Sequence, residues 1–190
     1  MRVASRLFQC YNFRVGWVIC HPAKSFAKII KRNDAFMSNV STASTRFYFG
    51  SDHAGRELKD ILLAHAKKRG LASEDLGTYT DDSVDYPDYA EKVGRSVVAD
   101  PGSLGVLVCG TGIGMSIAAN KVHGIRAALL YNESTARLAR QHNNANIITM
   151  GGREISPDQA IAWFDIFVMT VFEGGRHSRR LEKIARIEGP

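Results

Sequence analysis

The chain has 190 residues and 45% apolar content, which suits a globular domain with an appended segment. Its net charge of +6 lies in residues 1–45, which hold seven Lys or Arg and one Asp, whereas residues 46–190 carry 18 basic and 18 acidic residues. A folded part without surplus positive charge lacks the electrostatic signature of a nucleic-acid-binding domain. No apolar run approaches the roughly 20 residues of a membrane-spanning helix. We therefore expect no nucleic-acid partner and no membrane partner.

Residues 1–45 differ from the rest, because they are basic, rich in Ser and Thr near their end and without sustained periodicity. Two interpretations stay open. The segment is an organellar transit peptide, or the reading frame is too long and the protein starts at Met37. In both cases we expect this segment to be poorly ordered and the folded domain to span residues 46–190. We expect a cytoplasmic protein, or an organellar one if the transit peptide is genuine.

From Arg46 onward, strand patterns alternate with helix patterns. Strands are expected at 46–51, within 71–77, and at 104–109, 126–131 and 146–150. Helices are expected at 54–69, from Pro87 to about 98, from Met115, at 133–141 after an Asn132 cap, from Pro157 to about 171, and at about 177–187. This alternation predicts an α/β fold, a Rossmann-like three-layer α/β/α sandwich around a five-stranded parallel sheet.

Ligands of such sheets bind beyond the carboxyl ends of the strands. Three short segments occupy those places: Asp52 and His53 after the first strand, residues 109–114 after the third, and Gly152 with Arg153 after the fifth. We expect these segments to meet at one edge of the sheet.

The cysteines, Cys10, Cys20 and Cys109, are odd in number and form no CxxC pair, so we expect neither a disulfide framework nor a metal site. A cysteine at a strand end is usually a small apolar filler. Cys109, however, precedes the glycine-rich turn "GTGIG" and a helix start, where backbone N–H groups favour a thiolate and can hold an oxyanion. That pairing suits removal of a proton from a carbon next to a carbonyl. The turn matches neither the dinucleotide fingerprint nor a Walker loop.

Arg176, Arg179 and Arg180 follow "EGG" near the C-terminus, and Arg176 and Arg180 share a helix face. In a charge-balanced domain this cluster favours a bound phosphate, although such clusters are usually solvated. Structural roles are also open for Asp52 as a helix cap, and for Asn143 and Asn144 as the end of the helix that precedes them.

Six stretches together resemble one family: "GSDHAG", "DYPDYA", "VCGTGIGMSIAANK", "GIRAAL", "RQHNNANI" and "EGGRHSRRLEKI". They are similar to ribose-5-phosphate isomerase type B, of the ribose/galactose isomerase group, over residues 46–188. The resemblance implies interconversion of ribose 5-phosphate and ribulose 5-phosphate without metal or organic cofactor. It also implies a homodimer or a tetramer whose active sites lie at a subunit interface.

The resemblance further implies roles for individual residues. Cys109 would move the proton between C1 and C2, Thr111 would help hold the enediolate, and His142 with Asp52 nearby would open the furanose ring. The substrate-binding residues would be Gly110, Gly112, Ile113 and Gly114 for the enediolate, Tyr86 and Asn143 for sugar oxygens, and His53, Arg153, Arg176 and Arg180 for phosphate.

Two alternatives remain open at this stage. Within the same class, the substrate would be allose 6-phosphate or galactose 6-phosphate, a choice that residues 77–86 would influence. In another class, the chain would be a non-catalytic sugar-phosphate sensor on the same fold. The presence of Cys109 and His142 in one chain favours a homomeric pentose-phosphate enzyme.

Overall fold

The computed structural model describes residues 45–189. The predictions for the basic extension concern residues outside this range, apart from residue 45. The described chain folds around a five-stranded parallel sheet in the order β2-β1-β3-β5-β4. The strands are β1 Arg46–Ser51, β2 Ala72–Asp75, β3 Leu104–Cys109, β4 Ala127–Leu129 and β5 Ile147–Gly151.

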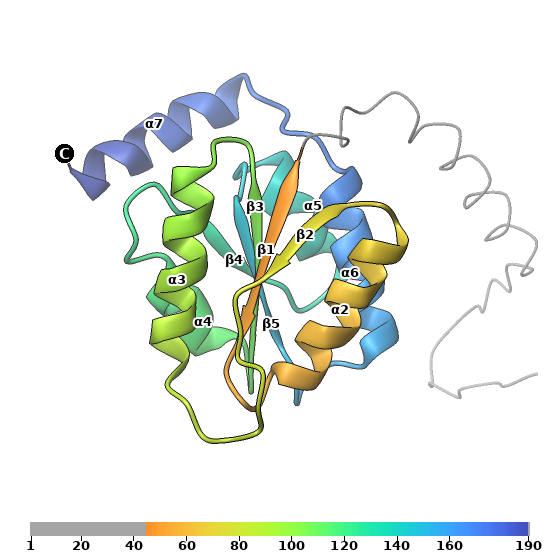
Figure 1. The fold of residues 1–190 in the computed structure, drawn as a ribbon. Coiled ribbons are helices and arrows are strands. Elements are labelled where there is room, and N and C mark those ends of the chain that lie inside the picture. Colours follow the sequence, from red (N-terminus) through yellow and green to blue (C-terminus); the bar gives the residue numbers. More distant parts are fainter. Residues whose placement is uncertain (1–44, 190) are drawn as a thin grey trace, which may run out of the picture. The chain divides into compact units, whose positions relative to one another are not determined.

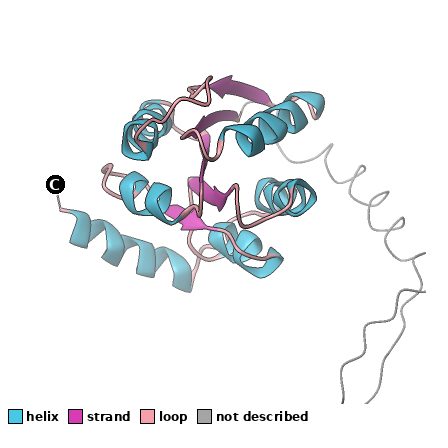
Figure 2. Ribbon diagram, turned by 90° about the horizontal axis from the view of Figure 1, so that it is seen from below, coloured by secondary structure: helices cyan, strands magenta, loops and turns pink. Residues whose placement is uncertain are grey.

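Helices cover both faces of the sheet, so the predicted three-layer α/β/α fold is confirmed (Figures 1 and 2). They are α2 Arg56–Lys68, α3 Tyr86–Ala99, α4 Ile113–Ala119, α5 Glu133–Gln141, α6 Pro157–Met169 and α7 Arg176–Glu188. On one face α2, α5 and α6 bury a cluster that includes Phe47, Leu62 and Phe164, and on the other α3 and α4 pack Val93 and Met115 against β3. Burial of such large side chains stabilises each layer by about 1.5–3 kcal/mol per residue.

Local signals set several of the helix boundaries. Asn132 and Ser156 each form a capping box at the start of α5 and α6, and Pro157 occupies the first turn of α6. The expected start of α4 at Met115 is wrong by two residues, because the helix begins directly after Gly112, which adopts a left-handed φ of 78°. The edge strand β4 is shorter than expected, with three residues.

Because the strands are parallel, all of them begin at one end of the sheet and finish at the other. We call the end where the strands finish the carboxyl edge (residues 51–55, 109–114 and 151–153) and the end where they begin the amino edge. Cys109 pairs with Gly151, the last residue of β5, whereas Gly105 pairs with Ile147, the first. Helix α6 runs back across the sheet, so the linker 170–175 and the start of α7 lie at the amino edge (Figure 1). Within the described residues, no helix is long and apolar enough to cross a bilayer.

Candidate active site

Cys109 ends the fully buried strand β3, and its side chain lies directly under the glycine turn. The residue is 4% exposed and belongs to the core beneath α3 and α4. Its Sγ accepts a hydrogen bond from the backbone N–H of Gly112 at 3.2 Å. The turn itself reaches the surface, because Thr111 is exposed and Ile113 is 52% exposed. The sulfur is therefore buried but within one hydrogen bond of an exposed amide loop.

Gly112 makes this geometry possible. Its φ of 78° lies in the left-handed region, and a Cβ there would come within 2.8 Å of the Met150 carbonyl carbon. Only glycine adopts that conformation without strain and permits so close an approach of two backbones. The turn can thus fold back and direct an N–H at Sγ.

The three segments predicted to meet at the carboxyl edge do meet. The N–H of Asp52 donates to the Val108 carbonyl at 3.2 Å, and the N–H of Gly152 donates to the Cys109 carbonyl at 2.8 Å. The N–H of Arg153 donates to the Gly110 carbonyl at 3.1 Å. These bonds lock the loops after β1, β3 and β5 around the cysteine.

Two residues that were predicted to bind the substrate flank the turn. A Cβ built on Gly110 would lie 3.6 Å from Nη1 of Arg153, and one built on Gly114 would lie 2.8 Å from Cζ of Tyr86. Arg153 and Tyr86 are both exposed. The turn thus presents its amides between a guanidinium and a phenol.

His53 also stands at this edge, where its Nδ1 accepts the N–H of Val84 at 3.3 Å. In the neutral ring this bond leaves the proton on Nε2, so the free nitrogen is a donor suited to an anion. Asp52 instead has a structural contact, since its Oδ1 accepts the N–H of Gly55 at 2.9 Å. The N-cap of α2 is Gly55, so the interpretation of Asp52 as the helix cap is wrong, and the Asp52 carboxylate instead closes the turn of residues 52–55 before the helix.

Residues 77–85 form a loop that is fastened to the carboxyl edge. Besides the His53 contact, Arg56 donates to Asp81 from Nε at 2.7 Å and from Nη2 at 3.1 Å. The Arg56 hydrogen bond lowers the pKa of the Asp81 carboxyl from its ordinary 3.8, although desolvation opposes it. This bidentate pair gives the loop a defined position beside His53.

A second group of predicted residues lies at the amino edge. His142 ends α5, and Asn144 adopts a left-handed φ of 43°, as expected for a residue that ends a helix. Arg126 donates to the Asn144 carbonyl from Nε at 3.1 Å and Nη2 at 2.9 Å, and Arg140 donates to its Oδ1 at 2.6 Å. Burial lowers the pKa of both arginines. They fix the turn that carries His142 and the exposed Asn143.

His142 is packed against the linker into α7. Its ring stacks on that of His177, with centroids 4.2 Å apart and planes within 10°. Oε2 of Glu173 lies 3.7 Å from Nε2 of His142 and 3.4 Å from Nε2 of His177. Arg176 and Arg180 are exposed in the first turns of α7, beside this group.

The donor atoms of His142, Glu173 and His177 all lie within 4.8 Å of one another, so they are the group in residues 45–189 that could reach one metal ion. The stacked rings argue against it, because imidazole lone pairs lie in the ring plane and parallel planes do not converge on one ion. The guanidinium of Arg176 also donates to Nε2 of His177 at 3.3 Å. This hydrogen bond occupies the Nε2 lone pair of His177, which also argues against metal binding.

Within a single chain Asp52 does not lie near His142, so the expected proximity of the two residues stays a prediction for a site shared between two chains. Asp52 follows β1 at the carboxyl edge, whereas His142 lies five residues before the start of β5 at the amino edge. A strand of five residues separates these edges by about 13 Å between its end Cα atoms. The predicted site residues therefore form two groups, one at each edge.

The sequence reasoning also missed Glu173 and His177. The available signal was their spacing of four residues, which places an acid beside a histidine when a turn or helix follows.

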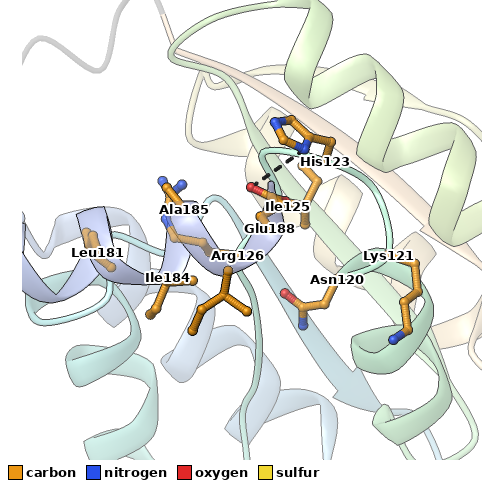
Figure 3. A pocket seen from close by; sticks show the side chains of 10 residues that line it. Asn120, Lys121, His123, Ile125, Arg126, Leu181, Ile184, Ala185 and Glu188 are labelled. Carbon is orange, nitrogen blue, oxygen red and sulfur yellow. Dashed lines mark ion pairs between the residues drawn. The ribbon is translucent and has the colours of Figure 1, made fainter. Parts of the chain in front are cut away.

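A pocket of about 530 Å³ under α7, lined by Arg126, Ile184 and Glu188 among others, contains none of the predicted site residues (Figure 3).

Sequence comparison identifies the family. The profile described as Ribose/Galactose Isomerase matches residues 47–184, which is more than half of the chain. The chain belongs to the ribose/galactose isomerase family. A relative from Escherichia coli, ribose-5-phosphate isomerase B, is 42% identical over 140 residues, covering 74% of this chain and 94% of the relative.

Solved structures agree with this assignment. The ribose 5-phosphate isomerase of Thermotoga maritima is 49% identical and superimposes with a TM-score of 0.73, covering 75% of this chain and 99% of that one. Ribose-5-phosphate isomerase B of Mycoplasma genitalium, solved with bound ribulose-5-phosphate, is 45% identical with a TM-score of 0.74 and covers 76% and 97% of the two chains.

Proposed function

We propose that this member of the ribose/galactose isomerase family interconverts ribose 5-phosphate and ribulose 5-phosphate. One relative at 46% identity is named probable ribose-5-phosphate isomerase B and another at 42% is named ribose-5-phosphate isomerase B, and each is matched over more than nine-tenths of its length. The observation in this chain that carries the proposal is the Cys109 sulfur in contact with the amide of Gly112. A base beside oxyanion donors is what aldose–ketose proton transfer requires.

The chemical steps follow from this arrangement. The Cys109 thiolate takes the proton from C2 of the open-chain aldose, and the C2–H electrons form the C1–C2 double bond of an enediolate. The negative charge moves to O1, where the amides of residues 110–114 and the Thr111 hydroxyl stabilise it. The thiol returns the proton to C1 while the O2 proton moves to O1, which gives the ketose. One well-placed oxyanion donor contributes about 3 kcal/mol to the transition state.

Ring opening needs an acid and a base before this step, and we assign it to His142. Asn143, beside it, would contact sugar oxygens, and Arg176 and Arg180 would bind the phosphate together with His53 and Arg153. Guanidinium groups suit this task because their forked donors match phosphate oxygens.

We further propose that each active site forms between two copies of the chain. His142, Asn143, Arg176 and Arg180 lie at the amino edge, while Cys109, His53, Arg153 and Tyr86 lie at the carboxyl edge. A substrate that must touch both groups needs the amino edge of a partner chain. Ile113 and Ile117 beside the amide turn, and Ile184 and Ile187 on α7, are exposed apolar side chains available for such an interface.

Mixing two inactive variants tests the composite site. Cys109→Ala should remove proton transfer, and His142→Asn should remove ring opening. Random exchange of subunits makes half of the dimers mixed, and each mixed dimer has one intact site of two. We therefore expect recovery of about a quarter of wild-type activity. No recovery in demonstrably mixed dimers would mean that each site belongs to one chain.

The activity itself is tested by a coupled assay with ribose 5-phosphate, allose 6-phosphate and galactose 6-phosphate. We expect the pentose to be preferred. Cys109→Ala should abolish turnover while the far-ultraviolet circular dichroism stays unchanged. A folded Cys109→Ala enzyme with near-normal turnover would overturn the assignment of the base.

A further inference from the structure

Glu173 and His177 surround His142, the histidine assigned to ring opening, and the mechanism proposed above gives neither of them a role. Helix α5 ends at Gln141 and His142, and the linker between α6 and α7 is fastened to that end. The N–H of Glu173 donates to the Gln141 carbonyl at 3.0 Å, and Nε2 of Gln141 donates to Oε1 of Glu173 at 2.8 Å. Two hydrogen bonds thus fix the Glu173 carboxylate beside His142.

The second carboxylate oxygen of Glu173 faces the two imidazole rings. Oε2 of Glu173 stands within ion-pair distance of Nε2 in both His142 and His177, at 3.7 Å and 3.4 Å. A carboxylate at this distance attracts an imidazole N–H and so orients the ring. It also favours the neutral tautomer with the proton on Nε2, which leaves Nδ1 of His142 to exchange a proton with the sugar.

The two stacked rings cannot both carry a proton easily, since two imidazolium ions 4.2 Å apart repel each other. His177 is 3% exposed, whereas His142 is partly exposed. Desolvation, together with the positive charges of His142, Arg176 and Arg180, lowers the pKa of His177. Its Nε2 accordingly accepts the Arg176 Nε–H at 3.3 Å, as a neutral ring does. His177 is therefore the neutral ring of the pair.

Resting on the function proposed above, we propose that Glu173 and His177 are positioning residues for ring opening. Glu173 orients the ring of His142 through its carboxylate, and His177 supports that ring from behind as a stacking partner. Arg176 directly follows the same linker, so phosphate binding and ring opening depend on one continuous segment. Glycines with left-handed φ at 174 and 175 allow the sharp turn that brings His177 back under His142.

The two directions of the reaction separate this role from a structural one. Ribose 5-phosphate is mainly a furanose and must be opened. Ribulose 5-phosphate cannot close a furanose ring, because the hydroxyl that would close it carries the phosphate. Exchange of its C1 proton with deuterium from solvent therefore reports the Cys109 step alone.

The test compares Glu173→Gln with wild type in both assays, on the full chain. We expect kcat for ribose 5-phosphate to fall at least about tenfold, because part of the rate enhancement from general acid catalysis depends on how the acid is placed. We expect KM to change less than about twofold, and deuterium exchange into ribulose 5-phosphate to stay within about twofold of wild type. Glu173→Asp should restore part of the lost kcat, and Glu182→Gln, which alters an exposed carboxylate of α7, should change nothing.

Variants of His177 test the stacking partner separately. His177→Phe keeps an aromatic face and should retain most of the turnover of ribose 5-phosphate, whereas His177→Ala should behave like Glu173→Gln. Equal loss of turnover and exchange in a folded Glu173→Gln enzyme, or loss of neither, would overturn the proposal. Failure of the proposed function looks different, because the wild-type chain would then neither turn over ribose 5-phosphate nor exchange the C1 proton.

Discussion

Replacement of Gly112 by alanine should damage both stability and catalysis, because its Cβ has no room. At a φ of 78° the new Cβ would come 2.7 Å from Cδ1 of Leu129 and 2.8 Å from the carbonyl carbon of Met150. The left-handed conformation alone costs a non-glycine residue about 1–2 kcal/mol. Overpacking against backbone adds about 1–3 kcal/mol.

Gly70 provides a matched control. Its φ is 74°, close to that of Gly112, but a Cβ there meets nothing within 4 Å. Gly70→Ala should therefore lose only the conformational term of about 1–2 kcal/mol and keep full turnover. The difference between the two variants isolates the collision at Gly112.

The catalytic consequence follows from the amide of Gly112. Relief of the collision must move the turn away from Met150, and the N–H that now lies 3.2 Å from Sγ of Cys109 moves with it. Misplacement of a reacting group by about 1 Å can cost about 100-fold in rate. Urea unfolding and the coupled isomerase assay measure the two effects. If Gly112→Ala matched Gly70→Ala in both, the close packing of the turn would be irrelevant to catalysis.

Other changes have separate outcomes. Arg176→Ala should raise KM for ribose 5-phosphate by about tenfold or more while kcat falls less, since a charge-assisted contact contributes about 1.5–3 kcal/mol; an unaltered KM would contradict the phosphate assignment. Arg126→Lys removes the two donors on the Asn144 carbonyl and should slow turnover of ribose 5-phosphate more than deuterium exchange into ribulose 5-phosphate. The folded state lowers the pKa of His177 below its ordinary 6.5, so its contribution to stability is present above that pH and is lost as the pH falls through the lowered value. The midpoint temperature of thermal unfolding should therefore fall more steeply below pH 6.5 for wild type than for His177→Phe. Parallel curves of midpoint against pH would refute the linkage.

The sequence predicted the elements and the carboxyl edge well, since both depend on local signals. Asn132 and Pro157 marked helix starts, and the apolar run before Cys109 marked the central strand. The rule that ligands gather where parallel strands end brought Asp52, Cys109 and Arg153 together correctly.

The amino edge was less predictable, for a physical reason. The position of His142 relative to Asp52 depends on which end of the sheet each loop occupies, and the resemblance supplied a shared site without saying which chain contributes each residue. The stacking of His142 on His177 depends on how the linker folds back under left-handed glycines. Neither contact leaves a periodic pattern in the sequence.

The placement of the two residue groups at opposite ends of the sheet has a consequence for how such an enzyme behaves on dilution. If residues from both ends must contact one substrate, an isolated chain contains all the reactive groups but cannot bring them together at one site. Specific activity then becomes a function of protein concentration, falling away below the dissociation constant of the pair and returning when the solution is concentrated again.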